Sequence, residues 1–326
     1  MTPSLDIIIV NWNSGRQLHQ CLASIACVNQ DIFILSRVCV VDNASKDGSL
    51  DGIEEYNFPI RVIHNEQNRG FAAACNQSAR ASQSDYLLFL NPDVMLSENA
   101  ITVPIAFMEQ PENKRVGIVG IQLLDDSGDV ARTCAHFPTP GRFCAIMLGL
   151  NMLSSRLFLD HFMEEWDHNE NRVVDQLIGA FFLVHRSLFE DLGGFDERFF
   201  VYFEDVDFSY QAWKEGWHSV YLAEAQAYHK GGGTSQQIKD RRLFYSLRSR
   251  ILYGYKHFSW WSATGVTLMT LLVEPFSRLI WASIRLSGME MVNTFKGYFM
   301  LWRASPMILK EAWGRRRDED TPTESL

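Results

Sequence analysis

Short runs of β-branched and aromatic residues alternate with helical patterns through the first third of the chain, and this alternation limits the fold more than any other feature. The extended runs are DIIIV at 6–10, RVCVVDN at 37–43, IRVIHN at 60–65 and DYLLFLNPDV at 85–94. The helical patterns between them are RQLHQCLASI at 16–25 and GFAAACNQSARAS at 70–82. Such alternation is typical of βαβ units around a mostly parallel sheet. We therefore predict an α/β fold.

The polar residues that follow these strands are the first candidates for a binding site. In open α/β sheets, ligands bind outside the carboxyl ends of the strands. The residues at those ends are Asn11, Trp12, Asp42, Asn43, Asn91 and Asp93.

The middle of the chain predicts a further strand, a turn and a helix. GAFFLVHR is the strand, Gly193 and Gly194 form the turn, and VDFSYQAWKEGW is the helix, with Gly216 as its C-terminal stop. This places Glu204 and Asp205 at the helix N-terminus, where the helix dipole favours negative charge.

The chain becomes helical throughout after HKGGGTS at 229–235. The apolar run WWSATGVTLMTLLV at 260–273 is followed by Glu274 and Pro275, so it ends short of the roughly 20 residues of a membrane span. We predict a catalytic domain over 1–236, an amphipathic helical extension over 237–314 and a disordered tail over 315–326. The extension either lies on a membrane surface or packs on the catalytic domain, and both alternatives stay open.

Charge and cysteine content exclude some classes of protein. The net charge of −9 and the pI near 5.5 argue against nucleic-acid binding. The six cysteines form no C-x-x-C pair, which is typical of reduced thiols in a cytosolic protein. The start MTPSLDIIIVNW has no basic region and only a short apolar run, so we predict neither a signal peptide nor an anchor and expect a cytoplasmic protein.

Two strand ends have a chemical and a structural interpretation. Asp93 in FLNPDV is a candidate ligand for Mg²⁺ or Mn²⁺, which take oxygen ligands, although N-P-D is also good β-turn chemistry. Asp42 in VDNASKDGS either accepts hydrogen bonds from a base or ribose, or forms an Asx turn with Asn43. For Asp42 taken alone, the turn is the better interpretation.

Two later segments add a candidate base and a candidate ligand. In FVYFEDVDFSY, three carboxylates lie among aromatic residues. Helix capping accounts for one or two of these acids, and Asp205 at a helix N-terminus is suited to take a proton from a hydroxyl. His229 precedes three glycines in AYHKGGGTS and is either structural or a metal ligand.

Taken in order, these segments resemble family 2 glycosyltransferases of the GT-A fold, within them the rhamnosyltransferase-like enzymes of bacterial surface polysaccharide synthesis. The resemblance covers roughly residues 5–257 and is carried by IIIVNWNSG, VVDNASKDGS, NRGFAAACNQ, YLLFLNPDV, IGAFFLVHRSLFEDLGGFDERFFVYFEDVDFSYQAWKEGW and YHKGGGTS. It implies an inverting hexosyltransferase with a Rossmann-like mixed sheet and a C-terminal helical extension. The donor would be a nucleotide-diphosphate sugar, dTDP-rhamnose first, and the acceptor a hydroxyl of a lipid-linked or glycan molecule at the inner face of the cytoplasmic membrane.

The resemblance also implies residue roles. Asp205 would be the catalytic base within an E-D motif with Glu204, and Asp93 and His229 would hold Mn²⁺ or Mg²⁺. Asn91 stands where the family's D-x-D motif has its first Asp, which puts direct coordination by that residue in doubt. The residues implied on the nucleotide side are Val10, Trp12, Asp42, Asn68 and Asn91, and those on the acceptor side are Tyr202, Phe203 and Asp207.

The sequence alone leaves two other functions open. A nucleotidyltransferase shares a nucleotide-binding front half but needs a basic G-x-G-x-R loop, and NWNSGRQLHQ has one Gly and one Arg. A non-catalytic nucleotide-sugar sensor, or a subunit of a membrane assembly complex, would fit the Trp-rich helices, although a sensor has no need for a base such as Asp205.

Overall fold

The computed structural model describes residues 2–150, 161–231 and 238–319. The strands are β1 (Ser4–Asn11), β2 (Ile34–Asp42), β3 (Ile60–His64), β4 (Tyr86–Leu90), β5 (Val94–Leu96), β6 (Val116–Leu124), β7 (Cys134–Ala135), β8 (Arg172–Val174), β9 (Gln176–Leu177), β10 (Phe181–His185) and β11 (His218–His229). The α-helices are α1 (Arg16–Ala26), α2 (Phe71–Ala79), α3 (Thr102–Met108), α4 (Pro140–Met147), α5 (Arg186–Asp191), α6 (Glu204–Lys214), α7 (Lys239–His257), α8 (Trp260–Leu272), α9 (Glu274–Ile284) and α10 (Gly288–Glu319).

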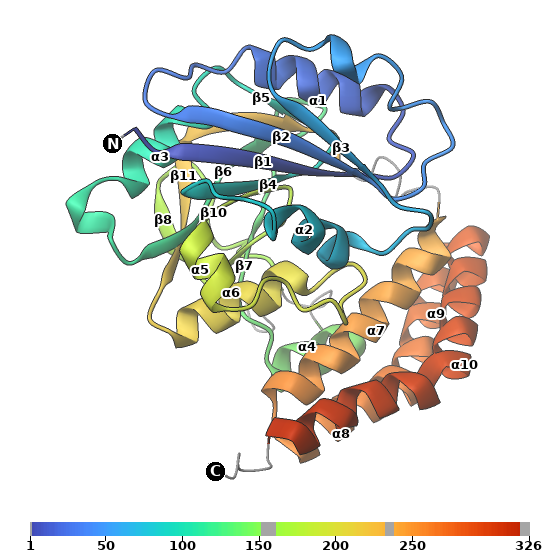
Figure 1. Cartoon of the computed structure of the whole chain (residues 1–326). Coiled ribbons are helices and arrows are strands. Elements are labelled where there is room, and N and C mark those ends of the chain that lie inside the picture. The colour runs from blue at the N-terminus through green and yellow to red at the C-terminus, as the bar shows by residue number, and fades with distance from the viewer. Residues whose placement is uncertain (1, 151–160, 232–237, 320–326) are drawn as a thin grey trace. The chain divides into compact units, whose positions relative to one another are not determined.

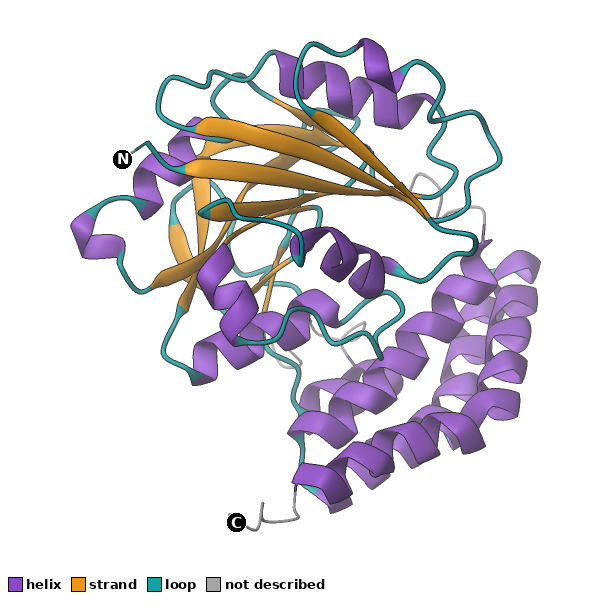
Figure 2. Ribbon diagram, in the orientation of Figure 1, coloured by secondary structure: helices purple, strands orange, loops and turns teal. Residues whose placement is uncertain are grey.

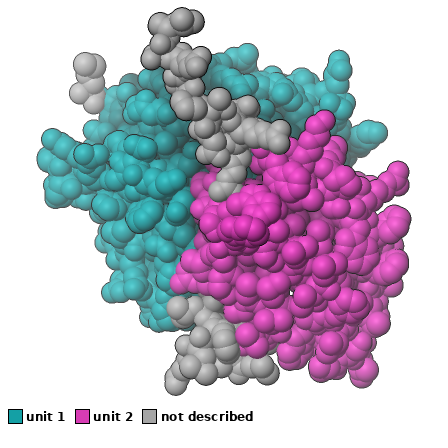
Figure 3. Space-filling model, turned by 90° about the horizontal axis from the view of Figure 1, so that it is seen from below, with its two compact units in different colours: residues 1–137, 162–200, 204–236 teal, residues 138–161, 201–203, 237–326 magenta. Residues whose placement is uncertain are grey.

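The described residues form two compact units, coloured separately in Figure 3. The first comprises residues 1–137, 162–200 and 204–236, and the second comprises 138–161, 201–203 and 237–326. The tail for which we predict disorder begins within α10, and residues 320–326 lie outside the described residues.

The first unit is built on a mixed sheet, drawn in orange in Figure 2. Its strand order is β3-β2-β1-β4-β10-β6-β11-β5, and β8 pairs with β11. The strands β1 to β4 pair in parallel, as the alternating pattern predicts. Strand β10 runs antiparallel to both β4 and β6. The fold is therefore α/β with a mixed sheet.

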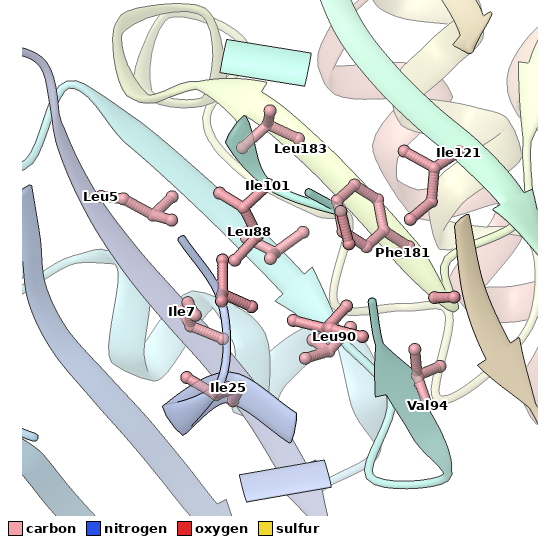
Figure 4. Close-up of a cluster of buried hydrophobic side chains, with 14 of the residues drawn as sticks. Leu5, Ile7, Ile25, Leu88, Leu90, Val94, Ile101, Ile121, Phe181 and Leu183 are labelled. Atoms are coloured by element: carbon pink, nitrogen blue, oxygen red, sulfur yellow. The ribbon is translucent and has the colours of Figure 1, made fainter. Parts of the chain in front are cut away.

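Helices cover both faces of this sheet because successive side chains of a strand point to opposite faces. Leu5, Ile7 and Ile9 of β1 lie in a core that includes side chains of α1 and α3. Ile8 and Val10 lie in a second core with residues of α2, α5 and α6. Figure 1 shows the two sets of helices on opposite sides of the sheet, and Figure 4 shows Ile25 of α1 beside Ile7 in the first core. Covering both faces leaves the ends of the strands as the open part of the sheet.

The second unit consists of α4 and the helices α7 to α10. Glu274, the first residue of α9, is 1% exposed and accepts hydrogen bonds from Arg250 of α7 at 2.5 Å and from Arg278 at 2.9 Å. Burial favours the neutral carboxyl group, but the two guanidinium groups outweigh it and hold the pKa of Glu274 below its ordinary value. A buried ion pair thus joins α7 to α9.

In the described part of the chain, no single helix is long and apolar enough to cross a bilayer. Helices α8 and α9 reach the length and apolar composition of a membrane span only when they are taken together. The chain bends by 42° at the break between them.

Candidate active site

The candidate residues meet at one edge of the sheet because of strand direction. The parallel strands β1, β2 and β3 end side by side, with Asn11 beside Asp42 and Asp42 beside His64. Strand β10 starts where β4 ends, since Phe181 pairs with Leu90 in antiparallel fashion. Strands β6 and β11 run parallel and end at this same edge.

The end of β2 is held by a network of side-chain hydrogen bonds. Asp42 is 4% exposed; its Oδ1 accepts from the amide of Asn11 at 2.9 Å and its Oδ2 from the backbone N–H of Ser45 at 3.1 Å. The amide of Asn11 also donates to the hydroxyl of Ser49 at 2.8 Å. Asp42 therefore helps to hold the turn after β2, and its contact with a nucleotide stays a prediction.

The other predicted nucleotide-side residues lie in and after neighbouring strands. Val10 is 9% exposed near the end of β1, and Trp12 is half-buried just beyond it. The side-chain oxygen of Asn68 accepts from the N–H of Gly70 at 2.9 Å.

The backbone conformation at position 70 and the close approach of Phe200 both require a glycine there. The φ of Gly70 is +85°, and a Cβ there would lie 2.3 Å from the carbonyl oxygen of Phe200. The next residue, Phe71, donates its N–H to that same oxygen at 2.7 Å. The start of α2 is thereby tied to the segment that leads towards the carboxylate cluster.

Asp93 and His229 lie together because β5 and β11 pair in antiparallel fashion. His229 is the register partner of Val94, the residue after Asp93. The Nε2 of His229 lies 3.4 Å from Oδ1 of Asp93, and both side chains are partly exposed, at 15% and 13%. These residues are far apart in sequence, and the structure brings them to one place.

Asn91 connects this pair to the loop before β10. Its N–H donates to the carbonyl of Ala180 at 2.9 Å, and its own carbonyl accepts from the N–H of Val94 at 3.2 Å. The backbone of the N-P-D segment is thus fixed beside Gly179, which precedes Ala180.

Gly179 in turn positions Asp205. The N–H of Gly179 donates to Oδ2 of Asp205 at 2.8 Å, and the N–H of Val206 donates to Oδ1 at 2.8 Å. Asp205 lies in the first turn of α6, as predicted, and is half-buried. Burial raises the pKa of Asp205 above its ordinary value, although these two donors and the side chain of Gln176 oppose the rise.

Glu204 and Asp207 have different surroundings. Glu204 is 5% exposed, and its Oε2 is buried without a hydrogen-bond partner. Burial, together with the nearby charges of Asp205 and Asp207, raises the pKa of Glu204 well above its ordinary value. Asp207 is fully buried and accepts a hydrogen bond from Gln211, one helical turn later, at 2.8 Å; its predicted acceptor-side role stays a prediction.

Tyr202 and Phe203 belong to the second unit, where the ring of Phe203 packs at a tilt against the rings of Phe143 and Tyr253. Both have a positive φ, 66° at Tyr202 and 73° at Phe203. Bulky residues rarely adopt this backbone conformation, so α6 is preceded by a strained segment. Their predicted contact with an acceptor stays a prediction.

Comparison with known proteins bears on the family of the chain. The model of the family described as "Glycosyl transferase family 2" matches residues 6–193, more than half of the chain. The chain belongs to this family. The match covers β1 to α5, including the N-P-D segment, and ends before the helix that holds Glu204 and Asp205.

Two characterised relatives are rhamnosyltransferases. The chain is 28% identical over 313 residues to the N-acetylglucosaminyl-diphospho-decaprenol L-rhamnosyltransferase of Mycobacterium tuberculosis, an alignment that covers 91% of this chain and 99% of the relative. It is 25% identical over 228 residues to the rhamnosyltransferase WbbL of Escherichia coli, covering 69% of this chain and 79% of the relative. The rhamnosyltransferase-like resemblance is confirmed.

Solved structures confirm the GT-A fold. The mannosyltransferase PcManGT of Pyrobaculum calidifontis, in complex with GDP-Man and Mn²⁺, has a TM-score of 0.54 and 16% identity, covering 98% of this chain and 89% of that one. TarS 1–349 of S. aureus, in complex with UDP-GlcNAc, has a TM-score of 0.52 and 16% identity, covering 91% and 81%.

The sequence does not predict the groups that hold the Asp205 carboxylate in place. Gly179 acts through its backbone N–H and Gln176 through a contact across the fold, and a single sequence carries no signal for either. The sequence places Asn11 at the end of a strand, but its role as the donor to Asp42 depends on the parallel register of β1 and β2.

Proposed function

We propose that this protein is an inverting glycosyltransferase that moves a sugar from a nucleotide-diphosphate donor to a hydroxyl of a lipid-linked or glycan acceptor. The observation that carries the proposal is the fixed carboxylate of Asp205, held by the N–H of Gly179 at the sheet edge that also gathers Asp93 and His229. The near full-length similarity to a rhamnosyltransferase supports dTDP-rhamnose as donor and a polyprenyl-diphosphate-linked sugar as acceptor.

Asp205 has the properties of a general base. It accepts two backbone hydrogen bonds, which fix the orientation of its carboxylate. Partial burial makes that carboxylate more basic than one in water. In the proposed step, Asp205 takes the proton of the acceptor hydroxyl as its oxygen attacks the anomeric carbon from the face opposite the diphosphate. A single displacement of this kind inverts the configuration at that carbon.

Asp93 and His229 fit a divalent cation, Mn²⁺ or Mg²⁺. They present one carboxylate and one imidazole 3.4 Å apart on a partly exposed surface. Among the described residues, no group of three or more His, Cys, Asp or Glu side chains is placed to hold a metal, so the remaining ligands would be phosphate oxygens and water. A cation there would stabilise the negative charge that develops on the leaving diphosphate.

The test measures nucleoside diphosphate release from dTDP-, UDP- and GDP-sugars, with and without Mn²⁺ or Mg²⁺, for the wild type and Asp205→Asn. A polyprenyl-diphosphate sugar is supplied as acceptor in half of the reactions. We expect metal-dependent release from one donor, reduced by about 10²–10⁴-fold in the variant because the general base is lost. The matched control is Asp191→Asn, which removes an exposed carboxylate at the end of α5.

Other results would change the assignment. Release that survives in Asp205→Asn moves the base to another group. Nucleotide binding without release, even with the acceptor present, favours a non-catalytic nucleotide-sugar sensor. Analysis of the product anomer by NMR decides between inversion and retention.

A further inference from the structure

The second unit exposes far more apolar surface than the first. Of the twenty-four large apolar side chains that are exposed among the described residues, seventeen lie between Trp260 and Trp313. Exposed apolar side chains are ordinary when scattered singly, but a large group of them marks an interaction surface.

The exposed apolar side chains follow helical spacing on α9. Phe276, Ile280 and Ile284 are each four residues apart and are 67%, 59% and 64% exposed. Residues four apart lie on one face of a helix, so these three form a single outward stripe. The opposite side of α9 packs inside the unit, where Pro275 and Ala282 are buried. Helix α9 thus has one apolar face directed inwards and another directed outwards.

The turn between α9 and α10 places a leucine in an unusual position. Leu286 is 92% exposed and has a φ of 53°. A leucine pays a backbone penalty in this region that a glycine would avoid, and at this exposure it contributes almost nothing to the core. Ile284 before it and Met289 after it are 64% and 69% exposed. Packing within the protein therefore gives no reason for an apolar tip on this hairpin.

The charges around the hairpin are cationic, although the whole chain is acidic. Residues 275–310 contain five basic residues and one acid, Glu290, in a chain of net charge −9. Arg285, Lys296 and Arg303 are exposed. Positive charge beside exposed apolar side chains complements the anionic head groups and acyl chains of a membrane surface.

We propose that the α9–α10 hairpin docks on an anionic lipid surface. The tip formed by Ile284, Leu286 and Met289 enters the interface, and the neighbouring cations contact the head groups. A second copy of the chain fits less well, because a two-fold interface would place this cationic surface against its own copy. Helices that present only one outward stripe lie in the plane of the interface rather than across it.

The experiment measures binding of the full-length protein to vesicles of phosphatidylcholine alone and of phosphatidylcholine with phosphatidylglycerol. We expect binding to the anionic vesicles that weakens as salt is raised. The variant Ile284→Ser/Leu286→Gly/Met289→Ser should reduce that binding at least about tenfold, since apolar burial contributes to it in proportion to area. The control is Ile34→Ser/Val173→Ser, which removes side chains 55% and 61% exposed on the first unit and should leave binding unchanged.

Leu286→Gly alone provides a second measurement that does not depend on damage to the fold. Glycine accepts the positive φ, so the single variant should keep or raise the melting temperature while it weakens vesicle binding. Absence of binding to the anionic vesicles, or equal binding by the triple variant, overturns the proposal. Sedimentation velocity without lipid tests the alternative of a second copy. If the wild type forms a dimer, the triple variant is a monomer and neither binds vesicles, the hairpin docks on another copy of the chain and not on a membrane.

Discussion

At the scale of single residues, the protonation of Asp205 sets the pH dependence that we expect. Burial raises the pKa of Asp205, so the carboxylate gains its proton at a higher pH than an exposed aspartate, about 3.9. A general base acts only when it is ionised. The acid limb of the kcat/KM profile should therefore lie above that ordinary value, and initial rates of transfer between pH 4 and pH 9 would show it.

A substitution at Gln176 tests the direction of the pKa shift of Asp205. The polar side chain of Gln176 lowers the pKa of Asp205. Gln176→Leu should move the acid limb to higher pH, because a leucine does not favour the ionised carboxylate. Two results would contradict Asp205 as the titrating base. One is an acid limb of the wild-type kcat/KM profile at the ordinary aspartate pKa, and the other is an acid limb that stays at the same pH in Gln176→Leu.

Asn91 supports a second prediction at this scale. Its backbone is fixed by Ala180 and Val94, so a change of side chain keeps the N-P-D segment in place. Asn91→Asp adds a carboxylate two residues from Asp93, and hard divalent cations prefer such ligands. The Mn²⁺ concentration that gives half-maximal activity should fall by about an order of magnitude.

The matched control for Asn91→Asp is Asn99→Asp, which adds the same charge at an exposed position after β5. It should leave the half-saturating metal concentration unchanged. A similar fall in both variants would indicate a general effect of charge, and no fall in Asn91→Asp would exclude this position from the metal site.

At the scale of elements, the ion pair between α7 and α9 is the clearest determinant of stability in the second unit. Glu274→Gln keeps the shape of the side chain and removes its charge. Arg250, only 7% exposed, is then left buried without a counter-ion, which typically costs about 3–5 kcal/mol. We expect the free energy of unfolding in urea to fall by this amount at neutral pH.

The pH dependence of that loss has a definite sign. The pKa of Glu274 is below its ordinary value in the folded protein, so its stabilising effect is present above the ordinary glutamate pKa and disappears as the pH falls through the lower value. The difference in the free energy of unfolding between the wild type and Glu274→Gln should become smaller at acid pH. Glu290→Gln, at an exposed position on α10, serves as the control and should change stability by less than about 0.5 kcal/mol.

Elements with a strong local pattern could be predicted from the sequence, and those defined by pairing could not. The runs at 6–10 and 85–94 correspond to β1 and β4, and the boundaries of α1 and α6 follow the apolar periodicity closely. The direction of β10, antiparallel between β4 and β6, depends on the whole sheet. The same holds for the pairing of β5 with β11, which brings Asp93 to His229.

At the scale of the whole molecule, the proposed catalytic centre reduces stability. The site gathers residues from the segment after β4, from β11 and from α6. In α6, the buried Glu204 and the half-buried Asp205 both have raised pKa values. A group whose pKa is raised on folding binds protons more tightly in the folded state, so the free energy of unfolding falls as the pH rises through that interval. Over the same interval, Asp205 ionises and activity should increase. Stability and activity are therefore expected to change in opposite directions with pH.

Glu204→Gln separates these two effects. The Oε2 of Glu204 is buried without a hydrogen-bond partner, and glutamine fills the same volume without a charge. As the pH rises from the ordinary glutamate pKa to the raised pKa of Glu204, the free energy of unfolding of the wild type should fall. Glu204→Gln has no such group to ionise, so this fall should be absent in the variant. The variant should then be more stable by about 1–3 kcal/mol at pH 8, with the difference vanishing near pH 4.

Thermal and urea unfolding of both proteins at pH 4, 6 and 8 measure this difference, and transfer rates on the same samples report activity. If Glu204 only supports the fold, Glu204→Gln keeps most of the activity while the alkaline loss of stability shrinks. If the variant is less stable than the wild type at pH 8, the ionised Glu204 has a stabilising partner in the fold. The raised pKa of Glu204 is then wrong. A stable variant without activity would instead give Glu204 a direct part in the reaction, because a neutral side chain of equal size then fails to replace it.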